Sequence, residues 1–153
     1  METQTTENRK QQMRFKISKK LLLQLSIGGG VVFWLTTIAT SLLPIAAEYR
    51  AAFSNWSIQT VWVCSLFMGI ILGCCVSYLL LRFSDKIRVK SPVLKSVILS
   101  SIALLIAIGL IDVPMIFQVP RASLYFLLIG IIFNTIRFLF LGIAVGYLYK
   151  RLN

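Results

Sequence analysis

Four stretches of the chain are apolar over about 20 residues or more, and short polar connections separate them. These stretches cover residues 21–47, 56–81, 93–113 and 122–149. A helix of about 20 apolar residues crosses a bilayer. A helix also satisfies its backbone hydrogen bonds within one segment, as the interior of a membrane requires. The sequence therefore predicts an all-α membrane protein with four transmembrane helices.

Composition and connection length refine this prediction. Hydrophobic residues make up 58% of the 153 residues and charged residues only 14%, whereas charged residues reach about a quarter of a soluble domain. Connections of about ten residues force neighbouring helices antiparallel, which predicts two helical hairpins. We expect a basic leader over residues 1–20 and one four-helix transmembrane domain over residues 21–153. The leader suits either a short helix on the headgroup surface or disorder up to about Arg9.

Lysine and arginine gather on one side of the predicted spans. The chain has 16 of these residues against 5 acidic ones, a net charge of +11. Six precede the first span, five lie at or near the second connection and two end the chain, whereas the first and third connections hold only Arg50 and Arg121. Positive charge near short loops stays on the cytoplasmic side. We therefore expect a multi-pass protein of the cell (cytoplasmic) membrane with both the N- and C-termini in the cytoplasm.

The basic residues also indicate which partners to expect. Each Lys or Arg beside a membrane gains about 1 kcal/mol near anionic lipid headgroups, so a bilayer with such headgroups is an expected partner. Nucleic acid is not an expected partner, because the positive charge borders membrane spans and does not line a soluble face.

The residues needed for catalysis are scarce. The chain has no histidine, which is the commonest general base and the commonest metal ligand. No span carries a lysine at depth, and Asp112 is the only aspartate near a span, so the usual pairs for intramembrane hydrolysis are missing. Cys64, Cys74 and Cys75 all fall in the second span and suit packing. We expect no catalytic residue, no cofactor and no metal site.

Arg137 is the charged residue that lies deepest within a span. It is 13 residues from Lys150 and 16 from Arg121, hence roughly 20 Å from either membrane surface at about 1.5 Å per residue. A charge there costs about 2.5–3.5 kcal/mol on insertion scales, so it should face protein or water. Asn134 lies three residues earlier, on the same helix face. Arg137 and Asn134 therefore form the candidate polar site within the membrane.

Two roles fit Arg137. It is either a site for an anionic headgroup, a substrate or a partner's acid, or an anchor that bonds hydroxyls of neighbouring helices. The hydroxyls at suitable depth are those of Thr36, Thr37, Ser65 and Ser101. Asp112 is the possible counter-charge, but straight helices leave it about 10–15 Å from the depth of Arg137. Their pairing requires Pro114 and Pro120 to let that end fold inward, and Arg121 is the easier partner for Asp112.

Two Gly-x-x-x-Gly motifs indicate close helix packing. Gly69 and Gly73 lie in the second span, and Gly142 and Gly146 lie in the fourth. Glycines four residues apart share one helix face and let another backbone approach closely. The motifs predict either packing within one subunit, which we favour, or a dimer interface.

Three consecutive glycines interrupt the first span. Gly28, Gly29 and Gly30 weaken a helix because glycine has a low helix propensity. They indicate a kink, a possible hinge or a very close contact with another helix.

The two halves of the chain resemble each other. Residues 68–73 and 141–146 carry glycines at equivalent places, and each segment precedes a tyrosine and an arginine. This pattern is expected from a duplicated helical hairpin, and chance convergence of membrane-like composition explains it equally well.

Sparse polarity within the spans favours a non-enzymatic membrane protein: an accessory, assembly or regulatory subunit that acts through helix–helix contacts with a membrane protein partner. The alternative is a small homo-oligomeric transporter or channel subunit in which Arg137 faces a water-accessible anion or headgroup site. The first hypothesis predicts a packed interior without a continuous cavity. The second predicts a polar cavity that reaches Arg137.

Overall fold

The structure is a computed structural model and describes residues 2–53, 56–83, 87–89, 91–117 and 123–152. The regular elements of these ranges are helices: α1 (Glu2–Ser41), α2 (Pro44–Phe53), α3 (Ile58–Phe83), α4 (Pro92–Ala107), the π-helical turn η1 (Ile108–Asp112), α5 (Val113–Ile116) and α6 (Ser123–Leu152). Four described stretches are long and apolar enough to cross a membrane: Lys19–Ser41, Ile58–Phe83, Pro92–Leu110 and Leu124–Leu152. The predicted all-α class with four candidate membrane helices is therefore confirmed.

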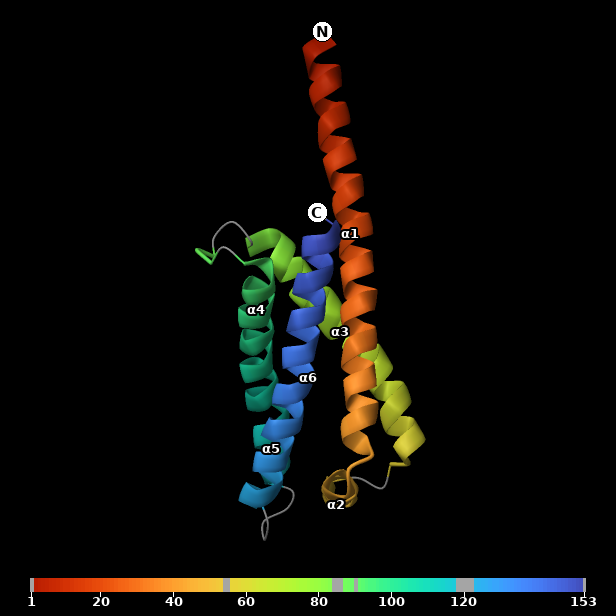
Figure 1. Cartoon of the computed structure of the whole chain (residues 1–153), viewed down its shortest axis with the longest axis vertical. Helices are drawn as coiled ribbons and strands as arrows, with labels where there is room; N and C mark the ends of the chain where they lie inside the picture. Colours follow the sequence, from red (N-terminus) through yellow and green to blue (C-terminus); the bar gives the residue numbers. More distant parts are fainter. Residues whose placement is uncertain (1, 54–55, 84–86, 90, 118–122, 153) are drawn as a thin grey trace.

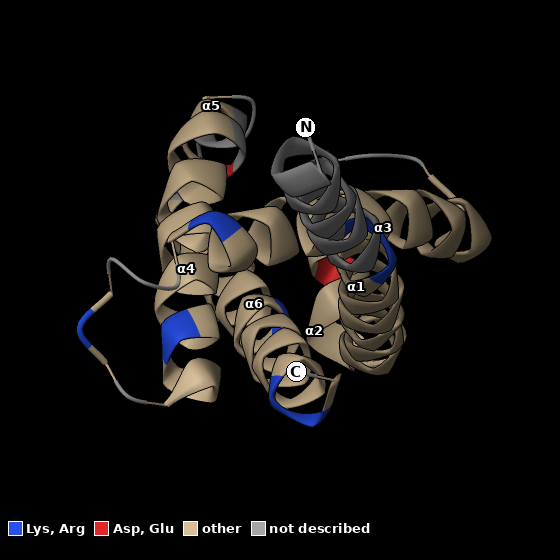
Figure 2. Ribbon diagram, turned by 90° about the horizontal axis from the view of Figure 1, so that it is seen from above, with Lys and Arg blue, Asp and Glu red and all other residues tan. Residues whose placement is uncertain are grey.

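The long helices pair as two hairpins. α1 packs on α3, α4 packs on α6, and α1 also packs on α6, which joins the two pairs. Figures 1 and 2 show α6 between α4 and α1. α1 begins and α6 ends on the same side of the bundle, where α1 extends well beyond the other helices. α2 and α5 lie at the opposite end, here named the α2 end (Figure 1). Which end faces the cytoplasm stays a prediction from the charge pattern.

Two apolar clusters lie one after the other along α6. The larger one is built around fully buried side chains of three helices, namely Leu25, Val76, Leu80, Leu141 and Val145. The smaller one, nearer the α2 end, contains Ala46, Ile129 and Phe133. Because Arg137 lies between Phe133 and Leu141 in α6, the fold places this charged residue at the boundary between the two clusters.

The first predicted span differs from the helix at both ends. α1 begins at Glu2 and continues without a break at residue 20, so the described leader is part of the same helix as the span (Figure 1). At the other end α1 stops at Ser41, six residues before the predicted limit of 47. Pro44 explains the stop, because proline has no N–H to donate and disfavours a helical conformation of the residue before it. The chain restarts there as α2, which turns toward α6.

A single widened turn ends the third candidate span. In η1 the N–H of Val113 donates to the carbonyl of Ile108, five residues back, where an α-helix would use a residue four back. Pro114 follows at once and cannot donate to the carbonyl of Leu110. The last residue of the widened turn is Asp112, which this geometry leaves only 5% exposed.

Candidate binding site around Arg137

Arg137 contacts side chains of two helices. Its Nη1 donates to Oδ1 of Asn134 at 3.4 Å, and its Nη2 donates to the hydroxyl oxygen of Thr40 at 3.2 Å. The guanidinium also lies 5.9 Å from the centre of the Phe133 ring, a cation–π distance. Its Nε is buried and has no partner among the described residues. An arginine has five N–H donors, so these contacts leave donors of the two Nη groups available.

Asn134 connects Arg137 to the only acid that the structure brings to this site from the described residues. Its Nδ2 donates to both carboxylate oxygens of Asp112, at 3.2 and 2.9 Å. The amide oxygen of the same side chain accepts from Arg137. Asp112 is therefore linked to Arg137 through an amide, a connection that depth arguments from straight helices do not predict. Arg121, the expected easier partner of Asp112, lies outside the described residues.

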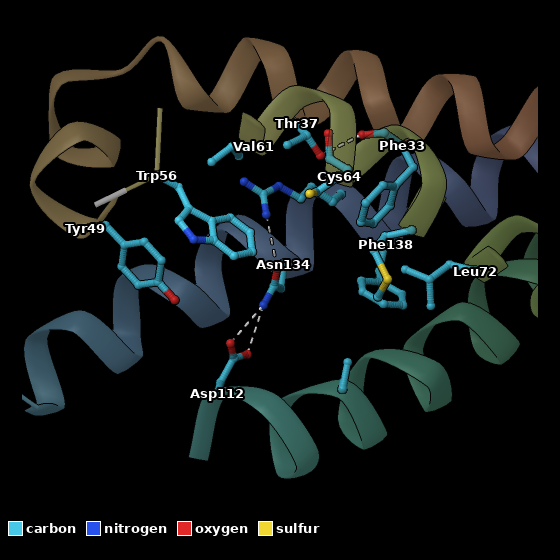
Figure 3. A pocket seen from close by; sticks show the side chains of 14 residues that line it. Phe33, Thr37, Tyr49, Trp56, Val61, Cys64, Leu72, Asp112, Asn134 and Phe138 are labelled. Atoms are coloured by element: carbon cyan, nitrogen blue, oxygen red, sulfur yellow. Dashed lines mark hydrogen bonds between the residues drawn. The ribbon is translucent and has the colours of Figure 1, made fainter. Parts of the chain in front are cut away.

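A cavity of about 360 Å³ reaches these polar groups (Figure 3). Every long helix and α2 contribute to its lining: Phe33, Thr37, Tyr49, Trp56, Val61, Cys64, Ser65, Met68, Leu72, Ala107, Asp112, Asn134, Arg137 and Phe138. Most of this surface is apolar, and the charged groups gather at one part of it. Trp56 and Met68 remain 57% and 44% exposed. The cavity is therefore open on the side of α3 and of the connection that precedes it.

Tyr49 closes the site at the α2 end. Its ring packs edge-on against Phe126 and Phe133, and its hydroxyl oxygen would lie 3.0 Å from a Cβ atom added at Gly130. Burial raises the pKa of Tyr49 above its usual range, the negative charge of Asp112 raises it further, and Arg137 opposes the rise. The phenol therefore stays neutral at physiological pH.

Comparison with known protein families places the chain in one of them. A family model, UU048, matches residues 6–149, nearly the whole chain. The chain belongs to the UU048 family. This family is uncharacterised, so membership assigns no activity to the protein. No curated protein and no solved structure is significantly similar to it.

The hydroxyl that reaches Arg137 in this UU048 protein is not one of those expected at its depth. Thr40, one turn nearer the α2 end than Thr36, supplies the contact. The expected hydroxyls instead bond carbonyls of their own helices: Thr36 to Val32, Thr37 to Phe33, Ser65 to Trp62 and Ser101 to Val97. Neither Thr40 nor Tyr49 is predicted from the sequence as part of the site. The glycine at 130, a turn before Asn134, is the sequence signal that leaves room for Tyr49.

The glycines of α3 lie against α1. A Cβ atom added at Gly69 would lie 2.8 Å from the carbonyl oxygen of Gly30, and one at Gly73 would lie 2.5 Å from that of Ser26. The helix backbones therefore approach each other without intervening side chains. This contact is within the chain.

The glycines of α6 lie against α4 in the same manner. A Cβ atom at Gly142 would lie 2.9 Å from Cα of Val97, and one at Gly146 would lie 2.5 Å from Cα of Val93. The two motifs thus pack within separate hairpins of the UU048 protein and do not face each other.

The three glycines of α1 lie inside a continuous helix. Gly29 and Gly30 are buried. A Cβ atom at Gly29 would lie 2.6 Å from a methyl group of Val145, and one at Gly30 would lie 2.9 Å from the backbone of Ile70. Gly28 lies beside the Leu148 side chain. The structure thus uses these glycines for close helix contact, and α1 is not broken at them.

Proposed function

We propose that this UU048 protein is a small non-enzymatic membrane protein that binds an anionic amphipathic molecule at Arg137, as a transporter or channel subunit would. The observation that carries the proposal is the cavity of about 360 Å³ that reaches a guanidinium group deep within a span. The accessory-subunit hypothesis predicts instead a packed interior without a continuous cavity. We propose that the protein lies in the cell membrane with both termini in the cytoplasm.

The chemistry of the lining supports this ligand class. Ligand cavities of about 300–1,000 Å³ are mainly apolar, with a few polar groups that fix the ligand's orientation. Here Arg137 offers Nη donors to an anionic group, while Leu72, Met68 and Phe138 offer apolar contacts to an alkyl or acyl chain. The open side near Met68 would admit such a chain from the surrounding lipid. Both a lipid headgroup and a free organic acid have this chemistry.

An accessory subunit that acts through helix–helix contacts is the second candidate. It is supported by α3, on which the apolar side chains of Val63, Phe67 and Ile71 are 57%, 63% and 55% exposed. A partner helix or a second copy of the chain would cover them, and so would lipid. The contact surface alone is therefore weaker support than a cavity with a charged group.

Native mass spectrometry of the protein, extracted gently from its own membrane, tests the proposal. The wild type should retain an anionic lipid or a small organic acid, and the bound mass identifies which. Arg137→Gln should lower the retained fraction about tenfold or more, because it removes charge-assisted hydrogen bonds. Arg82→Gln is the matched control, because Arg82 is exposed and lies in the last turn of α3, outside the cavity lining. This variant should retain the ligand.

Two results would overturn this proposal. Equal retention by wild type and Arg137→Gln would show that any bound molecule uses another site. A stoichiometric second protein together with an empty cavity would favour the accessory-subunit role. Thermal unfolding of each variant in the same detergent separates loss of binding from loss of folding.

A further inference from the structure

The amide of Asn134 is oriented by the charges on its two sides. Its Nδ2 faces the carboxylate of Asp112, which can only accept hydrogen bonds when ionised, and its Oδ1 faces the donors of Arg137. An amide presents a donor on one side and an acceptor on the other. Turning it over exchanges the two without moving the helix.

An anion bound at Arg137 changes the charge balance of the site. With Asp112 ionised, the site holds one positive and one negative charge, and a second anion makes it net negative. Like charges repel strongly in surroundings of low dielectric, and a second carboxylate-type group nearby favours the protonated form of an acid. Among the described residues that line the cavity, Asp112 is the acid placed to relieve this repulsion. The other titratable groups of the cavity lining are Tyr49 of α2, which stays neutral, and Cys64 of α3; the lining residues of α1 include none.

We propose that an anion binds at Arg137 together with one proton, which the Asp112 carboxylate takes up from solvent. The protonated acid then donates its O–H to Oδ1 of Asn134, whose amide has turned over. Nδ2 now faces Arg137 and donates to the anion beside the guanidinium. One O–H bond forms at Asp112 as the bond to that proton breaks in the hydronium ion or buffer acid that supplies it, and no other covalent bond changes. The loaded site therefore holds the anion in overall neutral form. This inference rests on the proposed function.

Binding of decanesulfonate to the protein in phosphatidylcholine nanodiscs tests the coupling, because this probe keeps its charge at every pH used. Wild-type affinity should fall about tenfold per pH unit on the alkaline side of the Asp112 titration, as expected when one proton binds with the ligand. In weakly buffered solution a pH indicator should register uptake of one proton per bound probe. Nanodiscs that also contain phosphatidylglycerol show whether a lipid headgroup competes with the free anion.

Asp112→Asn imitates the protonated acid, since its amide is uncharged and has a donor. It should bind the probe at about pH 8 as tightly as the wild type does on the acid side of the Asp112 titration, and take up no proton. Glu48→Gln is the matched control, because Glu48 is an exposed acid of α2 outside the cavity lining; it should keep the wild-type pH dependence. Asn134→Leu should bind weakly at both pH values.

The outcomes separate this inference from the proposed function. One outcome is that Arg137→Gln abolishes probe binding, while the wild type takes up no proton and Asp112→Asn binds the probe as the wild type does. This outcome overturns the coupling and leaves the binding function in place. Absence of binding by every form, including Asp112→Asn, overturns both. The coupling is supported if the affinity of the wild type and of Glu48→Gln depends on pH and the affinity of Asp112→Asn does not.

Discussion

The carboxylate of Asp112 and the guanidinium of Arg137 are held by opposite ends of one amide group, that of Asn134. The amide is a donor to the acid and an acceptor for the base, so a hydrocarbon side chain cannot replace either contact. The site thus connects η1 to the middle of α6 through a polar link inside a mainly apolar bundle. Its contribution to stability can be measured separately from any ligand.

Replacing Asn134 with leucine should destabilise the protein by roughly 1–3 kcal/mol, because it leaves buried polar groups of Asp112 and Arg137 without a partner. Equilibrium unfolding in mixed micelles of mild detergent and dodecyl sulfate measures the change. Thr135→Leu is the control, since Thr135 is exposed and bonds only the carbonyl of Ile131 in its own helix; it should change stability by less than about 0.5 kcal/mol. Equal effects of the two substitutions would contradict a structural role for the Asn134 side chain, which links Asp112 to Arg137.

Thr40 should matter to Arg137, whereas Thr36 should not. Thr40→Val removes the acceptor for Nη2 of Arg137 and should cost about 1 kcal/mol. Thr36→Val makes the same change of side chain at a hydroxyl that bonds only Val32 of its own helix, and should be nearly neutral. In an Arg137→Gln background the effect of Thr40→Val should shrink, and a double-mutant cycle in the same unfolding assay measures this coupling. An unchanged effect would mean that the hydroxyl stabilises α1 alone.

Part of this site is predictable from the sequence. Arg137 and Asn134 follow from a charge and an amide on one face of an apolar helix. Asp112 is predicted as a counter-charge because it is an acid, but its depth in the membrane argues against contact with Arg137. The widened turn η1 and the hydrogen bond from Asn134 bring it into the site, and the spacing of apolar residues predicts neither. Tyr49 is missed because α1 ends early, before Pro44, and the chain continues as α2, which packs on α6.

Substitution by alanine should destabilise the protein far more at the glycines of the close helix contacts than at a glycine in open space. Gly73→Ala places a methyl group 2.5 Å from the Ser26 carbonyl oxygen, so α1 and α3 must separate; overpacking of this kind costs about 1–3 kcal/mol. Gly109→Ala is the control, because no atom beyond its chain neighbours and its own helix backbone lies within 4 Å of the added group. It should be neutral or slightly stabilising in thermal unfolding. Equal tolerance at both positions would contradict the described packing of α3 on α1.

The charge pattern predicts the orientation of the bundle in the membrane. Positive residues at the end that holds both termini should remain in the cytoplasm. A fluorescent protein fused after Asn153 should therefore fluoresce, and a periplasmic phosphatase fused there should be inactive. The reverse result should be found for fusions after Ser57, in the connection between α2 and α3. A fluorescent fusion at Ser57 together with an active phosphatase at Asn153 would invert the predicted topology.

The two hairpins pack through the same glycine motif, so the effects of equivalent substitutions on their stability can be compared. In each, the second long helix places its Gly-x-x-x-Gly face on the first: Gly73 against Ser26 of α1, and Gly146 against Val93 of α4. Gly73→Ala and Gly146→Ala should each destabilise the protein, by similar amounts. The two glycines share no contacting atom, so their effects should add within about 0.5 kcal/mol in the double variant. Strong non-additivity would instead mean that α6, which packs on both α1 and α4, transmits the distortion from one hairpin to the other.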